Sequence, residues 1–361
     1  MIARLRAPAH PRYRSGARRR SPAYPLLVLG GLSVALLLTA VVALALGEEY
    51  IPPGAILGMA LQWLPVHPAR TWSDVDFVII TAIRLPRIAT AIVVGGSLGV
   101  AGAAFQGLFR NPLADPGIVG TSSGAGLGAM VALALPMQVM WLGFSQVTLL
   151  AFAGALGGMV LVYLLARVGG RLPSTSLLLA GFAVSAVLNA ASSLVMSLDN
   201  RMREMYHWLL GSLIDTTASQ LLPAAPLMAV GTIGLLALAG DLNVLLLGDE
   251  QSHYLGLRVT QRRVLILVFG SLLTAVAVSL SGIIAFVGLV VPHLARLLFG
   301  ANHRLLLPAS LLLGAIFLLI ADTLARMVLA PQELPVGVIT ALIGAPWFLV
   351  LLRRKRGEYT F

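Results

Sequence analysis

The sequence predicts an all-α polytopic membrane protein of about ten transmembrane helices. Of its 361 residues, 58% are hydrophobic and only 11% are charged, whereas a soluble protein carries about 25% charged residues. Apolar stretches follow one another from residue 25 to residue 352 without an intervening polar block. The bilayer is therefore the expected solvent for most of the chain, and a single membrane domain is the simplest organisation.

The apolar stretches are close in length to what a hydrocarbon core of about 30 Å requires. The stretch at 283–299 is the least regular, because it contains Pro292, His293 and Arg296. Counting it gives ten spans and puts both termini on one side. The ten stretches cover residues 25–46, 88–108, 117–135, 147–166, 177–198, 221–239, 264–281, 283–299, 305–327 and 336–352.

The net charge of +11 follows the membrane topology rather than a nucleic-acid surface, because the basic residues lie at the ends of apolar stretches. With ten spans, most of the 25 basic residues fall on the side of the two termini. The positive-inside rule makes that side the cytoplasm. Residues 1–24 are predicted to be a disordered basic arm, 25–352 a domain of ten transmembrane helices and 353–361 a cytoplasmic tail. Membrane lipid is an expected partner, and nucleic acid is not.

Small residues repeat at four-residue spacing in several stretches, as in Gly95/Gly99, Gly120/Gly124/Gly128 and Gly154/Gly158. Such spacing lets two helix backbones approach closely where no hydrophobic force drives association. These pairs predict helix contacts and carry no information about function.

Arg84-Leu-Pro-Arg87 stands just before the second stretch, on the predicted outer side. A spacing of three residues puts both guanidiniums on one helix face, and the cost of a charge at mid-bilayer favours the interface. The pair could bind the carboxylates of a partner or contact lipid headgroups. Asp322 and Arg326, four residues apart near the outer end of a later helix, can form an ion pair.

Two inner loops and one polar stripe are candidates for a transport pathway. Asn111-Pro-Leu-Ala-Asp-Pro116 predicts a tight turn, in which Asn111 and Leu113 could close a pore from below or form an ordinary turn. Leu172-Pro-Ser-Thr-Ser176 carries an N-cap signal for the following helix. On that helix Ser185, Asn189 and Ser192 share one face, which suits either a wide passage or interhelical hydrogen bonds.

The inner connection from Asp241 to Leu257 is amphipathic and is interrupted by Gly248 and Gly256. This spacing predicts two short helices at the membrane surface. They could contact a soluble partner or lie against lipid.

Several classes of activity are disfavoured. No Gly-x-x-x-x-Gly-Lys-[Ser/Thr] motif is present, so the chain is not by itself a P-loop ATPase. The motif Gly120-Thr-Ser-Ser-Gly124 resembles that of serine hydrolases, but no predicted strand precedes Ser122 as that chemistry requires. His293 and His303 lie beside arginines on the inner side, where a structural role is favoured over metal ligation. We expect no enzymatic activity, no metal and no cofactor.

Five segments occur in family order and resemble the permeases of type II ABC importers, the family that moves cobalamin, haem and ferric siderophores. The resemblance covers nearly everything after the basic arm, which is itself not a usual family feature. The five segments are Arg84-Leu-Pro-Arg87, Asn111-Pro-Leu-Ala-Asp-Pro116, the Leu-Gly pairs at 247–248 and 255–256, Phe286-Val-Gly-Leu-Val-Val-Pro-His293 and Leu334-Pro-Val-Gly337.

The resemblance implies a homodimer in the bacterial inner membrane, with two ATP-binding subunits on the cytoplasmic side and a periplasmic substrate-binding protein above. It implies docking of the binding protein on Arg84, Arg87 and Arg326. The matching gate positions are Asn111, Leu113, Thr175 and Ser176. Coupling to the ATPase is implied for helices in 242–257, including Leu247, Gly248, Leu255 and Gly256, and the helix carrying Ser185, Asn189 and Ser192 is expected to line the pathway.

Haem is the favoured substrate, because Arg201-Met-Arg-Glu-Met-Tyr-His207 offers cations for propionates and soft side chains for a macrocycle. Ferric siderophores and cobalamin remain alternatives. An ion-coupled secondary carrier is a further alternative from a different class, although the spans lack the chain of acidic residues that such carriers usually need.

Overall fold

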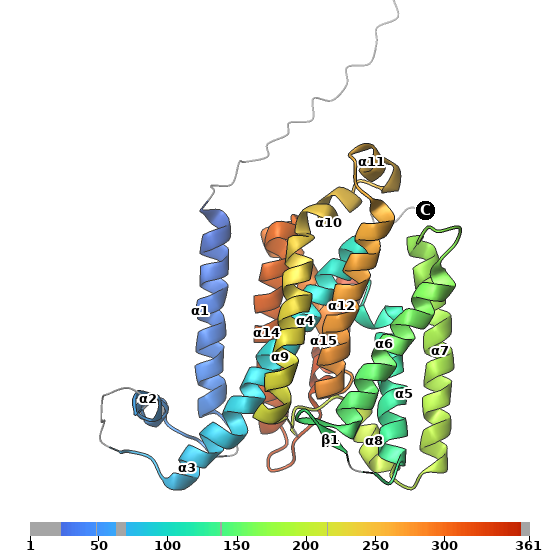
Figure 1. Ribbon diagram of the computed structural model, residues 1–361. Coiled ribbons are helices and arrows are strands. Elements are labelled where there is room, and N and C mark those ends of the chain that lie inside the picture. Colours follow the sequence, from blue (N-terminus) through green and yellow to red (C-terminus); the bar gives the residue numbers. More distant parts are fainter. Residues whose placement is uncertain (1–22, 48, 63–69, 138, 215, 355–361) are drawn as a thin grey trace, which may run out of the picture.

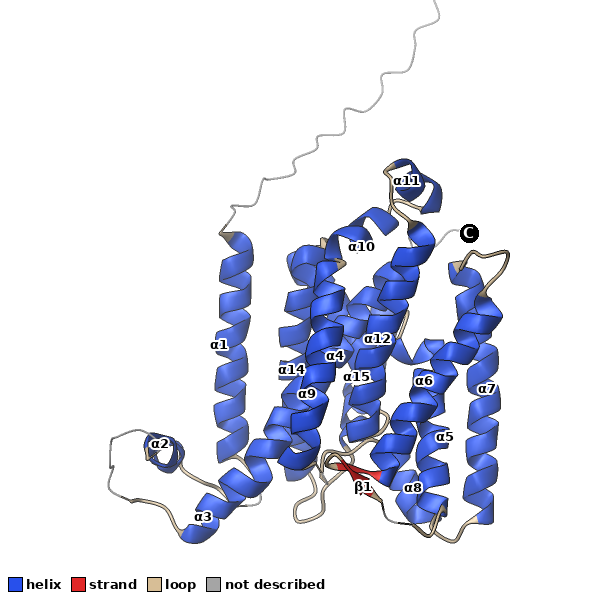
Figure 2. Ribbon diagram, in the orientation of Figure 1, coloured by secondary structure: helices blue, strands red, loops and turns tan. Residues whose placement is uncertain are grey.

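The computed structural model describes residues 23–354 except 48, 63–69, 138 and 215. The predicted basic arm therefore lies outside the described residues up to position 22, and the predicted tail does so from position 355. The described chain is a helical bundle with one short hairpin (Figures 1 and 2). The all-α fold is confirmed.

Seven helical segments within the described residues are long and apolar enough to cross a membrane, and three shorter apolar helices accompany them. Each of the ten predicted stretches overlaps one of these helical segments. The long segments are α1 (Tyr24–Ala45), the run from α3 (Asp74–Val78) through the π-helical η1 (Ile79–Arg84) to α4 (Leu85–Leu108), α6 (Gln146–Ala166), α7 (Ser174–Leu198), α9 (Ala218–Ala237), α12 (Val259–Ser281) and α14 (His303–Met327). The shorter ones are α5 (Thr121–Ala134), α13 (Val287–Phe299) and α15 (Val336–Arg354).

The remaining elements lie at the two ends of the bundle. At the predicted outer end are α2 (Pro53–Leu61), the hairpin of β1 (Met140–Trp141) and β2 (Phe144–Ser145), and α8 (Met202–Leu209). At the predicted inner end are α10 (Ala239–Leu245) and α11 (Asp249–Tyr254), at the same end of the bundle as the start of α1 (Figure 1). The 3₁₀ turn η2 (Pro116–Val119) connects α4 to α5.

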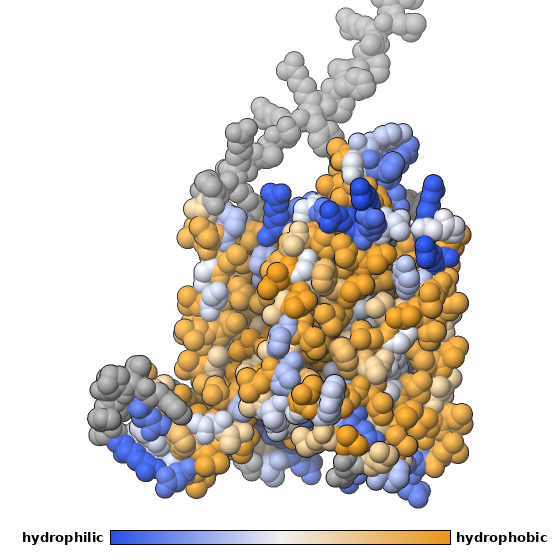
Figure 3. Space-filling view, viewed as in Figure 1, coloured by the Kyte–Doolittle hydropathy of each residue, from blue (hydrophilic) through white to orange (hydrophobic). Residues whose placement is uncertain are grey.

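The surface of the bundle carries an apolar belt between two polar ends (Figure 3). Large apolar side chains are exposed along the outer helices, for example Leu27 on α1, Leu164 on α6 and Phe182 on α7. Water does not favour such a surface, but the hydrocarbon core of a bilayer does. The chain is therefore a multi-pass membrane protein.

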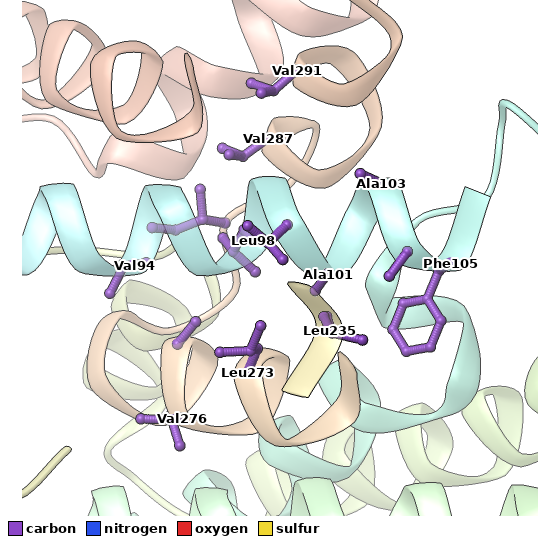
Figure 4. Packing of buried hydrophobic residues seen from close by; sticks show 14 of the residues in the cluster. Val94, Leu98, Ala101, Ala103, Phe105, Leu235, Leu273, Val276, Val287 and Val291 are labelled. Atoms are coloured by element: carbon purple, nitrogen blue, oxygen red, sulfur yellow. The ribbon is translucent and has the colours of Figure 1, made fainter. Parts of the chain in front are cut away.

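Helix α4 is the centre of the core. It contacts α9, α12, α13 and α14, and Val94, Leu98 and Phe105 on its faces are buried (Figure 4). Leu273 of α12 lies on one side of α4 and Val287 of α13 on the other.

The predicted small-residue contacts are confirmed. A Cβ on Gly95 of α4 would overlap the carbonyl of Gly314 on α14, and a Cβ on Gly154 of α6 would overlap the carbonyl of Gly124 on α5. The backbones of each pair are in contact, so glycine is required for the approach rather than for an unusual φ angle.

Two boundaries differ from the sequence prediction. Arg84 and Arg87 lie inside the continuous helix 74–108 rather than before it. In the stretch predicted at 283–299, helix α13 begins only at Val287. The chain leaves α12 through its cap Gly282 (φ 68°), and Phe286 adopts a left-handed φ of 68°. With 13 residues, α13 is about 20 Å long at 1.5 Å per residue, which is shorter than the hydrocarbon core.

The close approach of α5 and α6 makes a direct prediction. Gly154→Ala should lower the free energy of unfolding by about 1–3 kcal/mol, because the added Cβ meets the Gly124 carbonyl. Gly157→Ala is the matched control on the same helix, where a Cβ meets nothing within 4 Å, and it should be neutral or stabilising by up to about 1 kcal/mol. Thermal unfolding of the purified protein in detergent measures both. Equal effects would contradict this packing.

Candidate functional site

Two of the three predicted outer arginines contact a buried carboxylate. Asp322 on α14 is fully buried, and Arg87 on α4 donates to both of its oxygens, with Nη2 at 2.8 Å from Oδ1 and Nε at 3.1 Å from Oδ2. Arg326 forms the predicted ion pair with Asp322, its Nε lying 3.4 Å from Oδ2. Arg87 Nη1 also pairs with Glu333 Oε2 at 2.7 Å. Sequence reasoning gave Glu333 no role.

Arg84 and Arg326 bind the carboxyl end of α1. Arg84 donates to the carbonyls of Leu44, Ala45 and Glu49. Arg326 donates to the carbonyls of Ala43 and Leu46 at 3.2 and 3.4 Å. The last carbonyls of a helix lack intrahelical partners and carry partial negative charge. The two arginines therefore supply both hydrogen bonds and charge to the end of α1.

This arrangement changes the view of the predicted docking residues. Arg84, Arg87 and Arg326 are only 5%, 6% and 7% exposed, so they do not form the free interfacial pair expected from the sequence. Each already has internal acceptors. Docking of a partner's carboxylates on them remains a prediction, and it would require these internal contacts to open.

The two predicted gate segments meet at the inner end. Ser174, at the start of α7, donates to the carbonyl of Leu108 at the end of α4, at 3.4 Å. Asn111 is half-buried, and its side-chain oxygen accepts from the backbone N–H of Leu113 at 3.0 Å. Thr175 is exposed and Ser176 half-buried on the first turn of α7. The loops thus lie together, while their gating role remains a prediction.

The N-cap expected for α7 is wrong. Its N-cap is Pro173, without a side-chain hydrogen bond, because Ser174 instead bonds to Leu108 across the bundle. The first loop is capped differently: Asp115 accepts from the N–H of Gly117 at 2.8 Å. Burial raises the pKa of Asp115, and this hydrogen bond opposes the shift.

The polar stripe on α7 includes residues that line a cavity and a residue that forms an interhelical hydrogen bond, the two alternatives that the sequence left open. Ser185 and Asn189 line a cavity of about 410 Å³ together with Ser122 and Ser123. Ser185 also accepts a hydrogen bond from Ser123 on α5 at 3.1 Å. Ser192 is buried and donates to the carbonyl of Leu188 on its own helix. It is not among the residues that line this cavity.

The hydrolase and metal alternatives gain no geometric support. Ser122 follows the 3₁₀ turn η2 and the left-handed Gly120, so the strand–turn–helix elbow of a hydrolase is not formed there. His303 Nδ1 lies 2.9 Å from Asn243 Oδ1, and the ring of His293 packs edge-on against Trp347. Both histidines lie in structural contacts.

A larger cavity of about 820 Å³ opens at the outer end beside α8. Arg203, Tyr206, His207 and Trp208 line it from α8. Ser145 of the hairpin and Gly282 at the end of α12 complete other parts of its wall. Its volume lies in the range of about 300–1,000 Å³ that is typical of small-molecule sites. Arg201 is not among the residues that line this cavity. It forms an ion pair with Asp199, with Nε at 3.3 Å from Oδ1.

The inner connection forms the two predicted short helices, α10 and α11. As expected, glycines interrupt the segment between the two helices and after the second one. Gly248 has φ 108° and Gly256 has φ 81°, values that L side chains rarely adopt. Leu247 and Leu255 are more than half exposed, so the segment presents an apolar edge on the inner surface.

The outer cluster predicts unequal effects of removing its two carboxylates. Asp322→Asn should cost about 3–5 kcal/mol of folding stability, because it leaves two buried guanidiniums without their shared counterion. Glu333→Gln is the matched control; its side chain is 34% exposed, and its loss should cost about 1 kcal/mol or less. Thermal unfolding in detergent compares them. A Glu333→Gln effect as large as that of Asp322→Asn would refute the central role of Asp322.

The FecCD transport family model matches residues 32–354. The cobalamin import system permease protein of Halobacterium salinarum is 44% identical over 328 residues, which cover 86% of this chain and 87% of that protein. The hemin transport system permease protein of Yersinia pestis is 43% identical over 338 residues, covering 92% and 97%.

A solved structure supports the same relationship. A metal-chelate type ABC transporter, described in an inward-facing conformation, matches with a TM-score of 0.77 and 32% identity, covering 91% of this chain and 99% of that one. The family match spans nearly all of the chain, and the relatives are similar over most of their length. The chain belongs to the FecCD transport family, as its motifs predict.

Proposed function

We propose that this chain is the permease subunit of an ATP-driven importer that carries a metal chelate from the periplasm to the cytoplasm across the bacterial inner membrane. Membership of the FecCD transport family is the observation that carries this proposal. Because the sequence has no P-loop motif, ATP hydrolysis belongs to a separate subunit.

The proposed assembly is a homodimer with two ATP-binding subunits below and a periplasmic substrate-binding protein above. The exposed face of α7 supports the proposal that a second copy of the chain packs there. Asn189 and Ser193 are exposed on it among apolar side chains such as Phe182. A polar amide facing lipid is unfavourable, and a facing protomer or a water-filled pathway would satisfy it. Ser185 and Asn189 would then line that pathway.

Features of the inner surface support the proposal of ATP-binding subunits. Helices α10 and α11 stand out from the inner end of the bundle (Figure 1), and the exposed side chains of Leu247, Tyr254 and Leu255 offer apolar anchors. The left-handed Gly248 and Gly256 define the turns that present them. We assign coupling to this segment and gating to the loops with Asn111, Leu113, Thr175 and Ser176.

Haem is the proposed substrate. The outer cavity brings together Arg203, Tyr206, His207 and Trp208 from α8. A guanidinium can pair with a propionate carboxylate, aromatic rings can stack on a flat macrocycle, and an imidazole is a common ligand of iron. The name of the hemin permease of Yersinia pestis, 43% identical to this chain, is consistent with the proposal.

Two other chelates and one other mechanism compete. Cobalamin is supported by the 44% identity to the Halobacterium salinarum permease, and a ferric chelate by the 40% identity to the Fe(3+)-citrate import system permease protein of Bacillus subtilis. An ion-coupled carrier would transport without a partner. Its best acidic candidate, Asp322, is already engaged by two arginines, and transport by the purified chain alone under an ion gradient would revive this alternative.

Growth on haem as the only iron source is the first test. A deletion strain without another haem importer should fail to grow, and the wild-type chain supplied in trans should restore growth. Normal growth of the deletion strain on haem, together with a defect in ferric-chelate or cobalamin uptake, would replace haem as the substrate and leave the importer assignment standing.

Variants at the outer cavity sharpen the test. Arg203→Gln combined with His207→Ala should reduce haem uptake by about tenfold or more, through loss of a charge-assisted hydrogen bond and an iron ligand. Arg70→Gln is the matched control, because Arg70 lies on the same outer side and pairs with the exposed Asp74 rather than lining the cavity. Equal uptake by the double variant and the control would exclude a haem contact at α8.

A further inference from the structure

Asp249 joins three elements at the inner end of the bundle. It is the first residue of α11. Its Oδ1 accepts from Arg110 Nη2 at 2.7 Å and from Arg263 Nη2 at 2.6 Å. Arg110 follows the end of α4, and Arg263 is the fifth residue of α12. One carboxylate oxygen therefore connects the tip of the inner surface to two separate parts of the bundle.

Arg110 leads to the first gate segment. It immediately precedes Asn111 and adopts a left-handed φ of 50°, which is uncommon for a residue other than glycine. Its backbone N–H donates to the carbonyl of Gly107, and that of Asn111 donates to the carbonyl of Gln106. This constrained backbone joins the Arg110 side chain directly to the turn formed by Asn111 and Leu113.

Arg263 leads to the second gate segment. Its guanidinium is buried, and Nη1 donates to the carbonyl of Leu172 at 3.0 Å. Leu172 is itself buried and lies directly before the start of α7, which carries Thr175 and Ser176. Asp249 and Leu172 both line a cavity of about 720 Å³, and Arg263 bridges them along its wall.

The two short helices are held differently. Asn243 on α10 accepts from the backbone N–H of His303 at 2.8 Å, and its amide donates to Asn302 at 2.8 Å, so α10 is fixed to the start of α14. Gly248, with φ 108°, separates α10 from α11. On α11 the ionic contacts to the bundle converge on Asp249, which is half exposed.

We propose that Asp249 is a positioning residue that transmits displacement of α11 to both gate segments of the same chain. Arg110 carries the displacement to Asn111 and Leu113, and Arg263 carries it to the start of α7. This inference rests on the proposed function, because it requires a partner ATPase that moves α11. Loss of the carboxylate should therefore uncouple ATP hydrolysis from transport rather than abolish either assembly or hydrolysis.

The test is the number of substrate molecules transported per ATP hydrolysed, measured for the complete complex in proteoliposomes. Asp249→Asn should lower this ratio by about tenfold while the ATP-binding subunits still co-purify. Asp241→Asn is the matched control, since it removes an Asp–Arg pair with Arg262, at 3.2 Å, that makes no hydrogen bond or ion pair with either gate segment among the described residues. An unchanged ratio in Asp249→Asn overturns the proposal.

Arg110→Gln provides a second variant, in case Asp249→Asn does not fold with Arg263 unpaired. The Arg110 side chain is 38% exposed, so its replacement should preserve the fold and lower the ratio by about threefold. In the Asp249→Asn background it should have no further effect, because both changes break the same link. Additive effects would show independent roles. A wild-type complex that transports no chelate with ATP would refute the proposed function itself, whereas normal wild-type coupling with unaffected variants refutes only this inference.

Discussion

The buried carboxylate of Asp322 determines how the outer half of the bundle is assembled. Two guanidiniums lie beside it, from α4 and from its own helix α14. In a low-dielectric interior neither cation is tolerable without a counterion, and the carboxylate is equally unfavourable without them. The orientation of Arg326 toward Asp322 also aims its remaining nitrogens at the end of α1. Helices that are distant in sequence are thereby held in one register.

The inner end repeats this chemistry with different burial. There too one aspartate accepts from two arginines, but the Asp249 side chain is 49% exposed and that of Asp322 is fully buried. Water competes for Asp249 and for its half-exposed partner Arg110, so this pair can be exchanged at low cost. Arg87 and Arg326 can leave Asp322 only by uncovering buried charge. The same side-chain combination thus suits a fixed support at one end and an adjustable connection at the other.

Much of this architecture could be predicted from local sequence. Apolar stretches locate the helices, four-residue glycine spacing locates close contacts, and glycine punctuation locates α10 and α11, because each depends on residues near one another in the chain. The partners of Arg84 and Arg87 could not be predicted, since the acceptors are backbone carbonyls 35 to 40 residues away and a carboxylate 235 residues away. Arg263 was hidden for a related reason: a basic residue at the start of a span is expected from topology alone. The α8 segment was singled out for its composition, but only the fold shows which of its side chains share a cavity.

Helix α1 is mostly exposed to the surroundings of the bundle, with Ala43 and Ala45 as its buried residues. Arg84 and Arg326 donate hydrogen bonds to main-chain oxygens at its end, and every amino acid has such an oxygen. This part of the recognition of α1 does not depend on which apolar side chains the helix carries. The lipid-facing positions of α1 should therefore accept many apolar substitutions, whereas the small residues at its last turn and the two arginines should not.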